Sequence, residues 1–429
     1  MKGRFFRAVT SLALIVVIAL GARAAFAWNQ ERKMPANLVG LVPFLNETGN
    51  IAFSLALGHG YGSPYWQETG PTAWLTPVYP ALVAGVFRVF GIHTKQSFIA
   101  IVALNILFST ATCVPIFYIG KRVGGLGVAS GAAWLWAIFP NAVIIPYEWV
   151  WDTSLAALLM ATILWATLEL ADTQRLRDWC GYGLLWGLAL MTNPSLGSLL
   201  PVLLGWAAYR AWQRGRLRMS RPAVACVIAV LCCVPWTVRN YLAFHGFVPL
   251  RSNLPFELWL GNNEQFDPQS HVVPPSDPER TEIRNYIRMG ETAFMADKWR
   301  KAVDFIRAHP GLEVILYARR FVATWTGMEN PIAGFRDADS SLVRVTLISN
   351  TLAALGALWG ILWLIRSRSA YAFPLAACLI VYPLIYYVTH TSLRYRHPID
   401  PVVLLLVAIA IASLFQNRRG HAEVVSLPS

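Results

Sequence analysis

The sequence predicts an all-α membrane protein whose helices form a polytopic bundle of about ten spans. The 429 residues are 56% hydrophobic and only 14% charged, whereas a soluble domain carries roughly a quarter charged residues. Apolar runs near the ~20-residue length of a spanning helix recur along the chain. They are far longer than the strands of a membrane barrel, and within lipid a helix satisfies its own backbone hydrogen bonds.

The expected spans follow one another with short connections. In chain order they are Phe6–Trp28, Ser97–Gly120, Gly125–Pro146, Thr153–Ala171, Cys180–Thr192, Ser195–Trp212, Pro222–Val238, Leu342–Ile365, Tyr371–Thr389 and Pro401–Phe415. The short span that ends at Asn193-Pro194 is expected to form a bent pair with the next one. Val78–Ile92 is apolar but short and contains Arg88, which indicates a helix lying on the outer surface.

Positive charge is concentrated in alternate loops, which marks those loops as cytoplasmic. The basic clusters are Lys2/Arg4/Arg7, Lys121/Arg122, Arg175/Arg177, Arg210/Arg214/Arg216/Arg218/Arg221, Arg366/Arg368 and Arg418/Arg419. This placement explains the net charge of +13 without a nucleic-acid partner and puts both termini inside. The N-terminal charges and apolar run also fit a cleavable signal peptide, but Arg23 interrupts the run, which favours a retained first span.

Four regions are expected along the chain. Residues 1–239 form an N-terminal transmembrane bundle with a first outer loop at 29–96, and residues 240–341 form an outer, periplasmic subdomain. Residues 342–416 form the C-terminal transmembrane helices, and 417–429 form a cytoplasmic tail. Within the outer subdomain, a Pro-rich linker at 272–278 precedes a helix that Asp277 caps and that ends near Ala308. Leu312–Trp325 predicts a second amphipathic helix. The six cysteines lie in or beside apolar spans, so no disulfide is expected.

Two acidic positions at the outer membrane boundary are candidates for chemistry. Glu47 precedes an apolar helical pattern, which a loop of Gly, Pro and aromatic residues follows. The simpler interpretation is an acid that stays in water. Glu148 and Asp152 lie among aromatic residues in a very short outer loop. A carboxylate deep in the bilayer costs about 2.5–3.5 kcal/mol, so these acids are expected at the surface or in a polar cavity. Asp152 alternatively caps the helix that Thr153 begins.

The last outer loop carries basic groups where positive charge is less expected. Arg394, Arg396 and His397 flank Tyr395 and Pro398, and such groups suit an anion such as a lipid phosphate. The alternative interpretation is snorkelling at the membrane interface. Weaker signals of the same kind come from Lys95, Arg239 and Arg251. Metal-binding and phosphate-loop motifs are absent from the sequence, and its eight histidines are scattered, so neither a metal nor another cofactor is expected.

These motifs, in this order, resemble the GT-C superfamily of integral-membrane glycosyltransferases. The resemblance is closest to glycosyltransferase family 39, the protein mannosyltransferases and lipid A aminoarabinose transferases. It rests on five features: Glu47 with the I-A-x-S-L-A-x-G-x-G-Y that follows it, T-A-W-L-T-P-V-Y-P-A-L at Thr72–Leu82, the basic turn Gly120-Lys121-Arg122, Asp152, and R-Y-R-x-P from Arg394.

The resemblance implies an inverting glycosyltransferase that takes a sugar from a polyprenyl-phosphate donor and passes it to an acceptor glycan, lipid or protein outside the cytoplasmic membrane. It implies that Glu47 is the general base and Asp152 the second outer acid. Arg394, Tyr395 and Arg396 would lie near the carrier phosphate. Many members have Asp before the first-loop Glu, whereas this chain has Asn46, so Asp152 or Glu148 can share the base role. The competing hypotheses are a transporter or flippase of a lipid-linked sugar and a non-catalytic subunit of envelope assembly.

Overall fold

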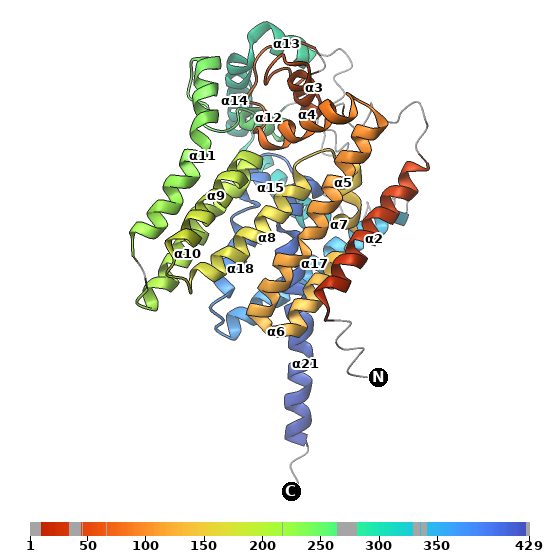
Figure 1. Cartoon of the computed structure of the whole chain (residues 1–429), viewed down its shortest axis with the longest axis vertical. Coiled ribbons are helices and arrows are strands. Elements are labelled where there is room, and N and C mark those ends of the chain that lie inside the picture. Colours follow the sequence, from red (N-terminus) through yellow and green to blue (C-terminus); the bar gives the residue numbers. More distant parts are fainter. Residues whose placement is uncertain are drawn as a thin grey trace.

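The computed structural model describes residues 10–33, 46–65, 67–216, 218–263, 281–328 and 341–425, together with residues 44 and 335. These residues form helices and contain no strand, apart from one β-bridge between Gly62 and Pro71. The all-α class is therefore confirmed (Figure 1). The linker at 272–278 and the cap at Asp277 lie outside the described residues.

The helices are α2 (Leu12–Glu31), α3 (Glu47–Leu57), α4 (Val78–Phe90), α5 (Lys95–Ala111), α6 (Cys113–Ile138), α7 (Pro140–Glu148), α8 (Thr153–Leu170), α9 (Leu176–Thr192), η2 (Pro194–Leu199), α10 (Leu200–Gln213), α11 (Ser220–Phe244), α12 (Leu254–Gly261), α13 (Thr281–Met289), α14 (Glu291–Ala308), α15 (Pro310–Thr326), α17 (Ser341–Arg366), α18 (Ala372–Ile380), α19 (Leu384–Val388), α20 (Leu393–Arg396), η3 (His397–Ile399) and α21 (Asp400–Val425).

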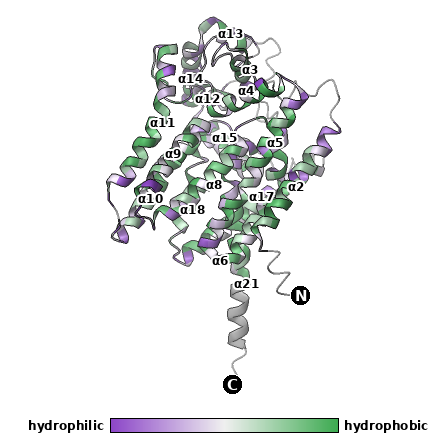
Figure 2. Ribbon diagram, viewed as in Figure 1, coloured by the Kyte–Doolittle hydropathy of each residue, from purple (hydrophilic) through white to green (hydrophobic). Residues whose placement is uncertain are grey.

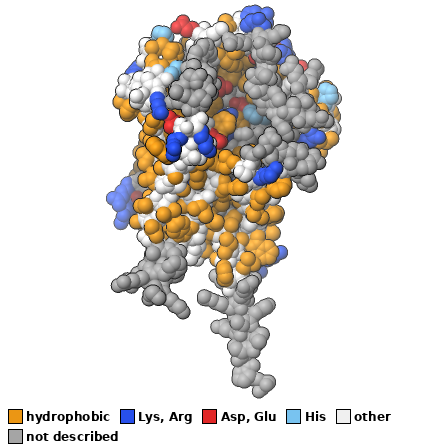
Figure 3. All heavy atoms as spheres, turned by 90° about the vertical axis from the view of Figure 1, so that its right-hand side faces the viewer, with side chains coloured by type: hydrophobic (Ala, Val, Ile, Leu, Met, Phe, Trp, Pro, Cys, Tyr) orange, Lys and Arg blue, Asp and Glu red, His pale blue; other side chains and the backbone are white. Residues whose placement is uncertain are grey.

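The protein is a multi-pass membrane protein. In the described residues, six helical segments are long and apolar enough to cross a membrane: Leu12–Glu31, Lys95–Ile138, Thr153–Leu170, Ser220–Phe244, Ser341–Arg366 and Leu393–Phe415. Two shorter apolar helical segments accompany them, so the count of ten spans stays a prediction. Hydrophobic residues dominate the long helices (Figure 2). Figure 3 shows a broad apolar surface below a more highly charged end.

A reversal at Gly125 divides α6 into two antiparallel arms. Gly125 has φ 78° and ψ −171°, which is not helical. A Cβ on Gly120 would lie 2.7 Å from the Cα of Ala129, although nine residues of straight helix span about 13 Å. The close approach therefore needs glycine, and it confirms the turn expected between these two spans. At this turn Arg122 pairs with Glu169 at 2.9 Å and with Asp172.

The break expected at Asn193-Pro194 is confirmed, because α9 ends at Thr192 and Asn193 is extended. The helix expected on the outer surface, α4, packs against α3 and α5, and its place relative to the membrane stays a prediction. Its Val83 and Phe87 are fully buried in the main core. Its amphipathic face therefore contacts protein.

Helices α12, α13 and α14, which belong to the region expected outside the membrane, lie at the same end of the molecule as α3 and α4, while α21 ends at the opposite end (Figure 1). Arg320 of α15 ties this region to the C-terminal helices, because it donates to the carbonyls of Tyr387 (3.2 Å), Val388 (3.0 Å) and Gly261. Gly261 has no side chain to separate it from the carbonyl of Thr389. Helices α12 and α15 are thus bonded directly to the C-terminal part of the bundle.

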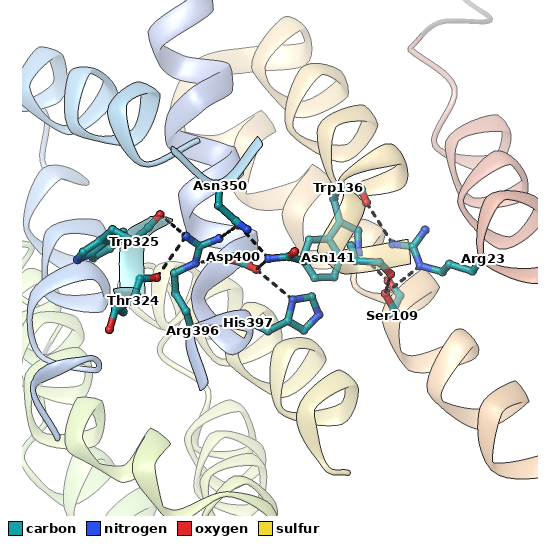
Figure 4. A network of polar contacts seen from close by, with 11 residues as sticks. Arg23, Ser109, Trp136, Asn141, Thr324, Trp325, Asn350, Arg396, His397 and Asp400 are labelled. Carbon is teal, nitrogen blue, oxygen red and sulfur yellow. Dashed lines mark hydrogen bonds and ion pairs between the residues drawn. The ribbon is translucent and has the colours of Figure 1, made fainter. Parts of the chain in front are cut away.

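A buried polar network joins α21 to neighbouring helices (Figure 4). Arg396 Nε donates to Asp400 Oδ1 at 2.8 Å, and His397 Nδ1 lies 3.1 Å from Asp400 Oδ2. Arg396 also donates to the carbonyl of Trp325 (2.8 Å) and to Asn350. These buried charges are paired and hydrogen-bonded, as burial of ions requires.

Candidate functional site

Glu47 occupies the first position of α3, where the local sequence fixes it. The side chain of Asn46 accepts a hydrogen bond from the amide of Gly49 at 3.0 Å and so caps the helix. Gly49 lies against the backbone of Phe44, with no room for a Cβ. Asn46 therefore serves the helix start, and Glu47, which follows it, lines a cavity.

Asp152 precedes α8 and does not cap that helix through its side chain. The capping interpretation is therefore wrong. The carboxylate instead interacts with the side chain of Asn193, at the break between α9 and η2, and with the nearby guanidinium groups of Arg251 and Arg394. Asp152 also lines the cavity that Glu47 lines.

Arg394 is held by the aromatic residues of the short loop between α7 and α8. Its guanidinium carbon lies 4.9 Å from the ring centre of Trp149 and 4.4 Å from that of Trp151. It also lies 4.8 Å from the ring of Tyr395 and donates to the Tyr395 hydroxyl at 2.9 Å. Cation–π contacts of this kind are strongest when the cation is desolvated. The tryptophans beside Asp152 therefore fix the cation opposite it.

The cavity gathers three acids and two arginines from separate parts of the chain. Its volume is about 90 Å³, and the charged residues that line it are Glu47, Asp152, Glu257, Arg251 and Arg394. Tyr79, Tyr386, Tyr395 and Trp74 complete much of its wall. The structure thus brings together four of the expected residues, namely Glu47, Asp152, Arg394 and Tyr395.

Burial raises the pKa of both acids, so each keeps its proton to a higher pH than it would in water. Burial raises the pKa of Asp152 to about 6, although Arg251 and Arg394 act in the opposite direction. Burial likewise raises the pKa of Glu47, which Arg394 partly offsets and Glu257 reinforces. A carboxylate whose pKa approaches neutrality is better matched to proton transfer than one in water.

A second, larger cavity of about 570 Å³ lies on the other side of Arg394. Its walls come from α7, α15 and α17 and are mostly apolar, with Ile144, Ile145, Leu342 and Leu347 among them. Glu148 lines this second cavity, so the structure does not place it with Glu47 and Asp152. Arg394 is the charged residue that lines both cavities.

Several expected binding residues lie elsewhere. Lys95 pairs with Glu31 at 2.9 Å. Arg239 donates to the carbonyls of Thr72 (2.6 Å) and Tyr61, and so holds the Gly/Pro loop onto α11. Neither residue lines either cavity.

Arg396 and His397 are completely buried in the Asp400 network rather than at the cavity. Two residues along a helix are turned by about 200°, so Arg394 and Arg396 face opposite ways. His397 also stacks on Trp136, with ring centres 5.2 Å apart. This geometry supports a structural role for Arg396 and His397.

The sequence reasoning missed Glu257 and gave little weight to Arg251. Arg251 lies between α11 and α12 and donates to the Ser195 hydroxyl at 3.4 Å, and Glu257 lies within α12. The available signal was an acid within the aromatic segment N-L-P-F-E-L-W, at the start of the outer region. Within the described residues, no cluster of three or more His, Cys, Asp or Glu side chains is arranged to hold a metal ion.

The cavity lies in an all-α, multi-pass membrane protein, and comparisons with known proteins find similarity to membrane glycosyltransferases. A family model described as dolichyl-phosphate-mannose-protein mannosyltransferase matches residues 74–238, less than half of the chain. These residues include Asp152. A search of curated protein sequences finds no match.

Solved structures share the fold. The chain is similar to the oligosaccharyltransferase AglB of Archaeoglobus fulgidus in complex with an inhibitory peptide and a dolichol-phosphate, with TM-score 0.56 and 13% identity over 100% of this chain and 53% of that one. A second structure of an oligosaccharyltransferase from that organism, with Zn and sulfate, gives TM-score 0.54 and 12% identity over 95% and 49%. The chain spans about half the length of these enzymes. The resemblance to the GT-C superfamily is thus confirmed.

Proposed function

We propose that this protein is an inverting glycosyltransferase that moves a sugar from a polyprenyl-phosphate donor to an acceptor at the outer face of the cytoplasmic membrane. One observation carries the proposal. Glu47 and Asp152 line the same cavity as Arg251 and Arg394, so candidate bases and phosphate-binding cations face one space. The family match and the fold shared with a dolichol-phosphate-bound enzyme support the same chemistry.

The second cavity suits the lipid part of the donor. Its volume of about 570 Å³ lies in the range of small-molecule sites, and its apolar walls match a prenyl chain. Arg394 borders both cavities, so a phosphate at its guanidinium would have the sugar on the acidic side and the lipid on the apolar side. Arginine presents several donors in one plane, which suits phosphate oxygens.

The proposed reaction needs one base and no separate acid. A carboxylate, either Glu47 or Asp152, takes the proton of an acceptor hydroxyl while that oxygen bonds to the anomeric carbon. The bond from the anomeric carbon to the phosphate oxygen breaks, and its electron pair leaves with the polyprenyl phosphate. Charge grows on this phosphate during the step, so Arg394 stabilises the transition state more than the bound donor.

The orientation of the site is part of the proposal. The cavity lies at the end that carries the outer helices, whereas α21 ends at the other (Figure 1). The ion pairs of Arg122 and Arg214 with Asp172 lie on the connections expected in the cytoplasm. Cytoplasmic termini and an outer site follow if the basic loops face inward.

Substitution of the two acids tests the function. In purified protein, Glu47→Gln and Asp152→Asn should each lower sugar transfer, and loss of the base should cost roughly 10²–10⁴-fold in kcat. Binding of the polyprenyl-phosphate donor should persist, since both variants keep the shape of the side chain. Glu68→Gln, a mostly exposed acid in the Gly/Pro loop, is the control. Full turnover in both cavity variants would exclude these two acids as the base, whereas a wild-type protein that transfers no sugar would argue against an enzyme and favour a transporter.

A further inference from the structure

A third carboxylate, Glu257, reaches the cavity from α12 of the outer region. Its Oε1 accepts a hydrogen bond from the side chain of Asn253 at 2.8 Å. Its Oε2 lies 3.2 Å from Nδ1 of His390. The Glu257 side chain is 22% exposed and that of His390 14%, so both partners are largely removed from water. The proposed proton transfer does not use this pair.

On its other side, His390 contacts Tyr395, which in turn contacts Arg394. Its Nε2 lies 3.1 Å from the hydroxyl of Tyr395, and that hydroxyl accepts a hydrogen bond from Arg394 at 2.9 Å. Arginine only donates, so the Tyr395 proton is free to point at His390. The Glu257 carboxylate, 3.2 Å from Nδ1, favours the tautomer with the proton on Nδ1, and Nε2 is then the acceptor for Tyr395. In this tautomer of neutral His390, the contacts from Arg394 through Tyr395 and His390 to Glu257 are mutually compatible.

This chain of polar contacts lies in the wall between the two cavities. Tyr395 and Glu257 line the acidic cavity, His390 lines the apolar one, and Arg394 lines both. Tyr395 is held in plane by stacking on Tyr386, with ring centres 5.0 Å apart and an interplanar angle of 3°. Rigid support of this kind is what a group that binds a charged ligand requires.

We propose that Glu257 and His390 are positioning residues that, through Tyr395, orient the Arg394 guanidinium toward the donor phosphate, and that protonation of His390 releases it. The inference rests on the proposed function, because it assigns the polyprenyl phosphate to Arg394. Glu257 holds the tautomer of His390, and His390 holds the hydroxyl on which Arg394 rests. A doubly protonated imidazole has no acceptor for Tyr395.

The charges around His390 make this a switch below neutral pH. They are Glu257 on α12, Arg320 on α15, and Arg394 with Tyr395 on α20. Burial lowers the pKa of His390 below its ordinary value, and the two arginines act in the same direction, while Glu257 opposes them. His390 is therefore neutral at neutral pH. As the pH falls through this lowered pKa, the imidazole becomes charged, and its Nε2 proton can then only be donated to the Tyr395 oxygen, where it competes with Arg394.

Binding of polyprenyl phosphate to the purified full-length protein tests the inference. In the wild type, affinity should fall by about tenfold as His390 becomes protonated, the effect of losing one hydrogen bond to a charged group. His390→Phe should bind about tenfold more weakly at neutral pH and lose this pH dependence. His390→Gln offers Tyr395 an acceptor that does not titrate, so it should keep the affinity and lose only the pH dependence. Glu257→Gln should raise the KM for donor more than it lowers kcat.

Tyr387→Phe is a matched control, because Tyr387 neighbours this segment and bonds Trp325 rather than His390. Unchanged affinity and pH dependence in both His390 variants would overturn the inference and leave the proposed function intact. A wild-type protein that does not bind polyprenyl phosphate at any pH would instead overturn the proposed function. If His390→Phe does not fold, the pH profile of His390→Gln decides the question.

Discussion

Arg394 shows how single residues give the site its charge. Its guanidinium stacks against Trp149 and Trp151, which come from the same loop as Asp152. A planar guanidinium keeps its edge donors free while its faces contact rings, which a lysine ammonium cannot do. Asp152 lies close enough to Arg394 for its carboxylate to interact electrostatically with the guanidinium. The loop between α7 and α8 therefore supplies both the acid and the support of the cation.

The protonation state of Asp152 predicts how turnover depends on pH. A general base must be ionised, and burial raises the pKa of Asp152 to about 6. If Asp152 is the base, kcat at saturating donor should fall roughly tenfold per pH unit below about 6 and level off above it. Saturation separates this effect from donor binding through His390. A pH series of kcat in the wild type and in Asp152→Asn measures it, and a flat wild-type profile would exclude Asp152 as the base.

At the level of elements, the Gly/Pro loop between α3 and α4 is held from two sides. Arg239 of α11 bonds its carbonyls. On the other side, Glu291 of α14 accepts hydrogen bonds from the amide of Ala73 (2.7 Å), from Ser252 (2.6 Å), from Tyr286 (2.6 Å) and from Thr72. The Glu291 side chain is buried, so water could not easily accept these hydrogen bonds if the carboxylate were removed. The loop carries Trp74, Leu75 and Thr76 of the cavity wall.

Removing the Glu291 side chain should loosen this loop. Glu291→Ala leaves the buried amide of Ala73 and its neighbours without an acceptor, at a cost of about 1–3 kcal/mol for each unsatisfied group. Hydrogen exchange at residues 67–76 should become faster, and the unfolding temperature should drop. Asp304→Ala, an exposed acid on the same helix, serves as the reference. Equal exchange in the two variants would show that Arg239 alone holds the loop.

For the molecule as a whole, the Asp400 network links the C-terminal helix to the interior. Arg396 and Asp400 form a completely buried ion pair, which Asn141 and Asn350 extend to α7 and α17 (Figure 4). Arg394 lies two residues before Arg396, on the same short helix α20. The network therefore fixes the position of α20 and, with it, the direction in which Arg394 points.

Breaking this pair should destabilise the whole bundle. Asp400→Ala leaves a buried guanidinium without its counter-charge, and such a loss costs about 3–5 kcal/mol. The unfolding temperature in detergent should decrease strongly. The double variant Arg396→Met, Asp400→Leu removes both charges and should recover much of the stability. A single variant as stable as the wild type would contradict a structural role for the pair.

The sequence predicted the helices better than the site, for physical reasons. Hydrophobic length and Gly or Pro breaks are local, so the ends of α8 and the reversal at Gly125 could be predicted. The placement of Glu47 beside Asp152 came from the family resemblance. The sequence could not separate Arg394 from Arg396, because their directions depend on where the short helix α20 begins. The presence of Glu257 in the cavity could not be predicted, because it depends on how α12 packs against helices that are distant in the sequence.

The contacts of Arg320 and Asn262 impose an order on biosynthesis. Asn262 donates to the carbonyl of Val388 at 3.0 Å, and Arg320 reaches the same carbonyl. Both residues leave the ribosome before the segment that completes their bonding. Asn262 and Arg320 can therefore complete these bonds only after residue 388 has been synthesised. A chain truncated before that residue would lack the contacts that join α12 and α15 to the C-terminal segment.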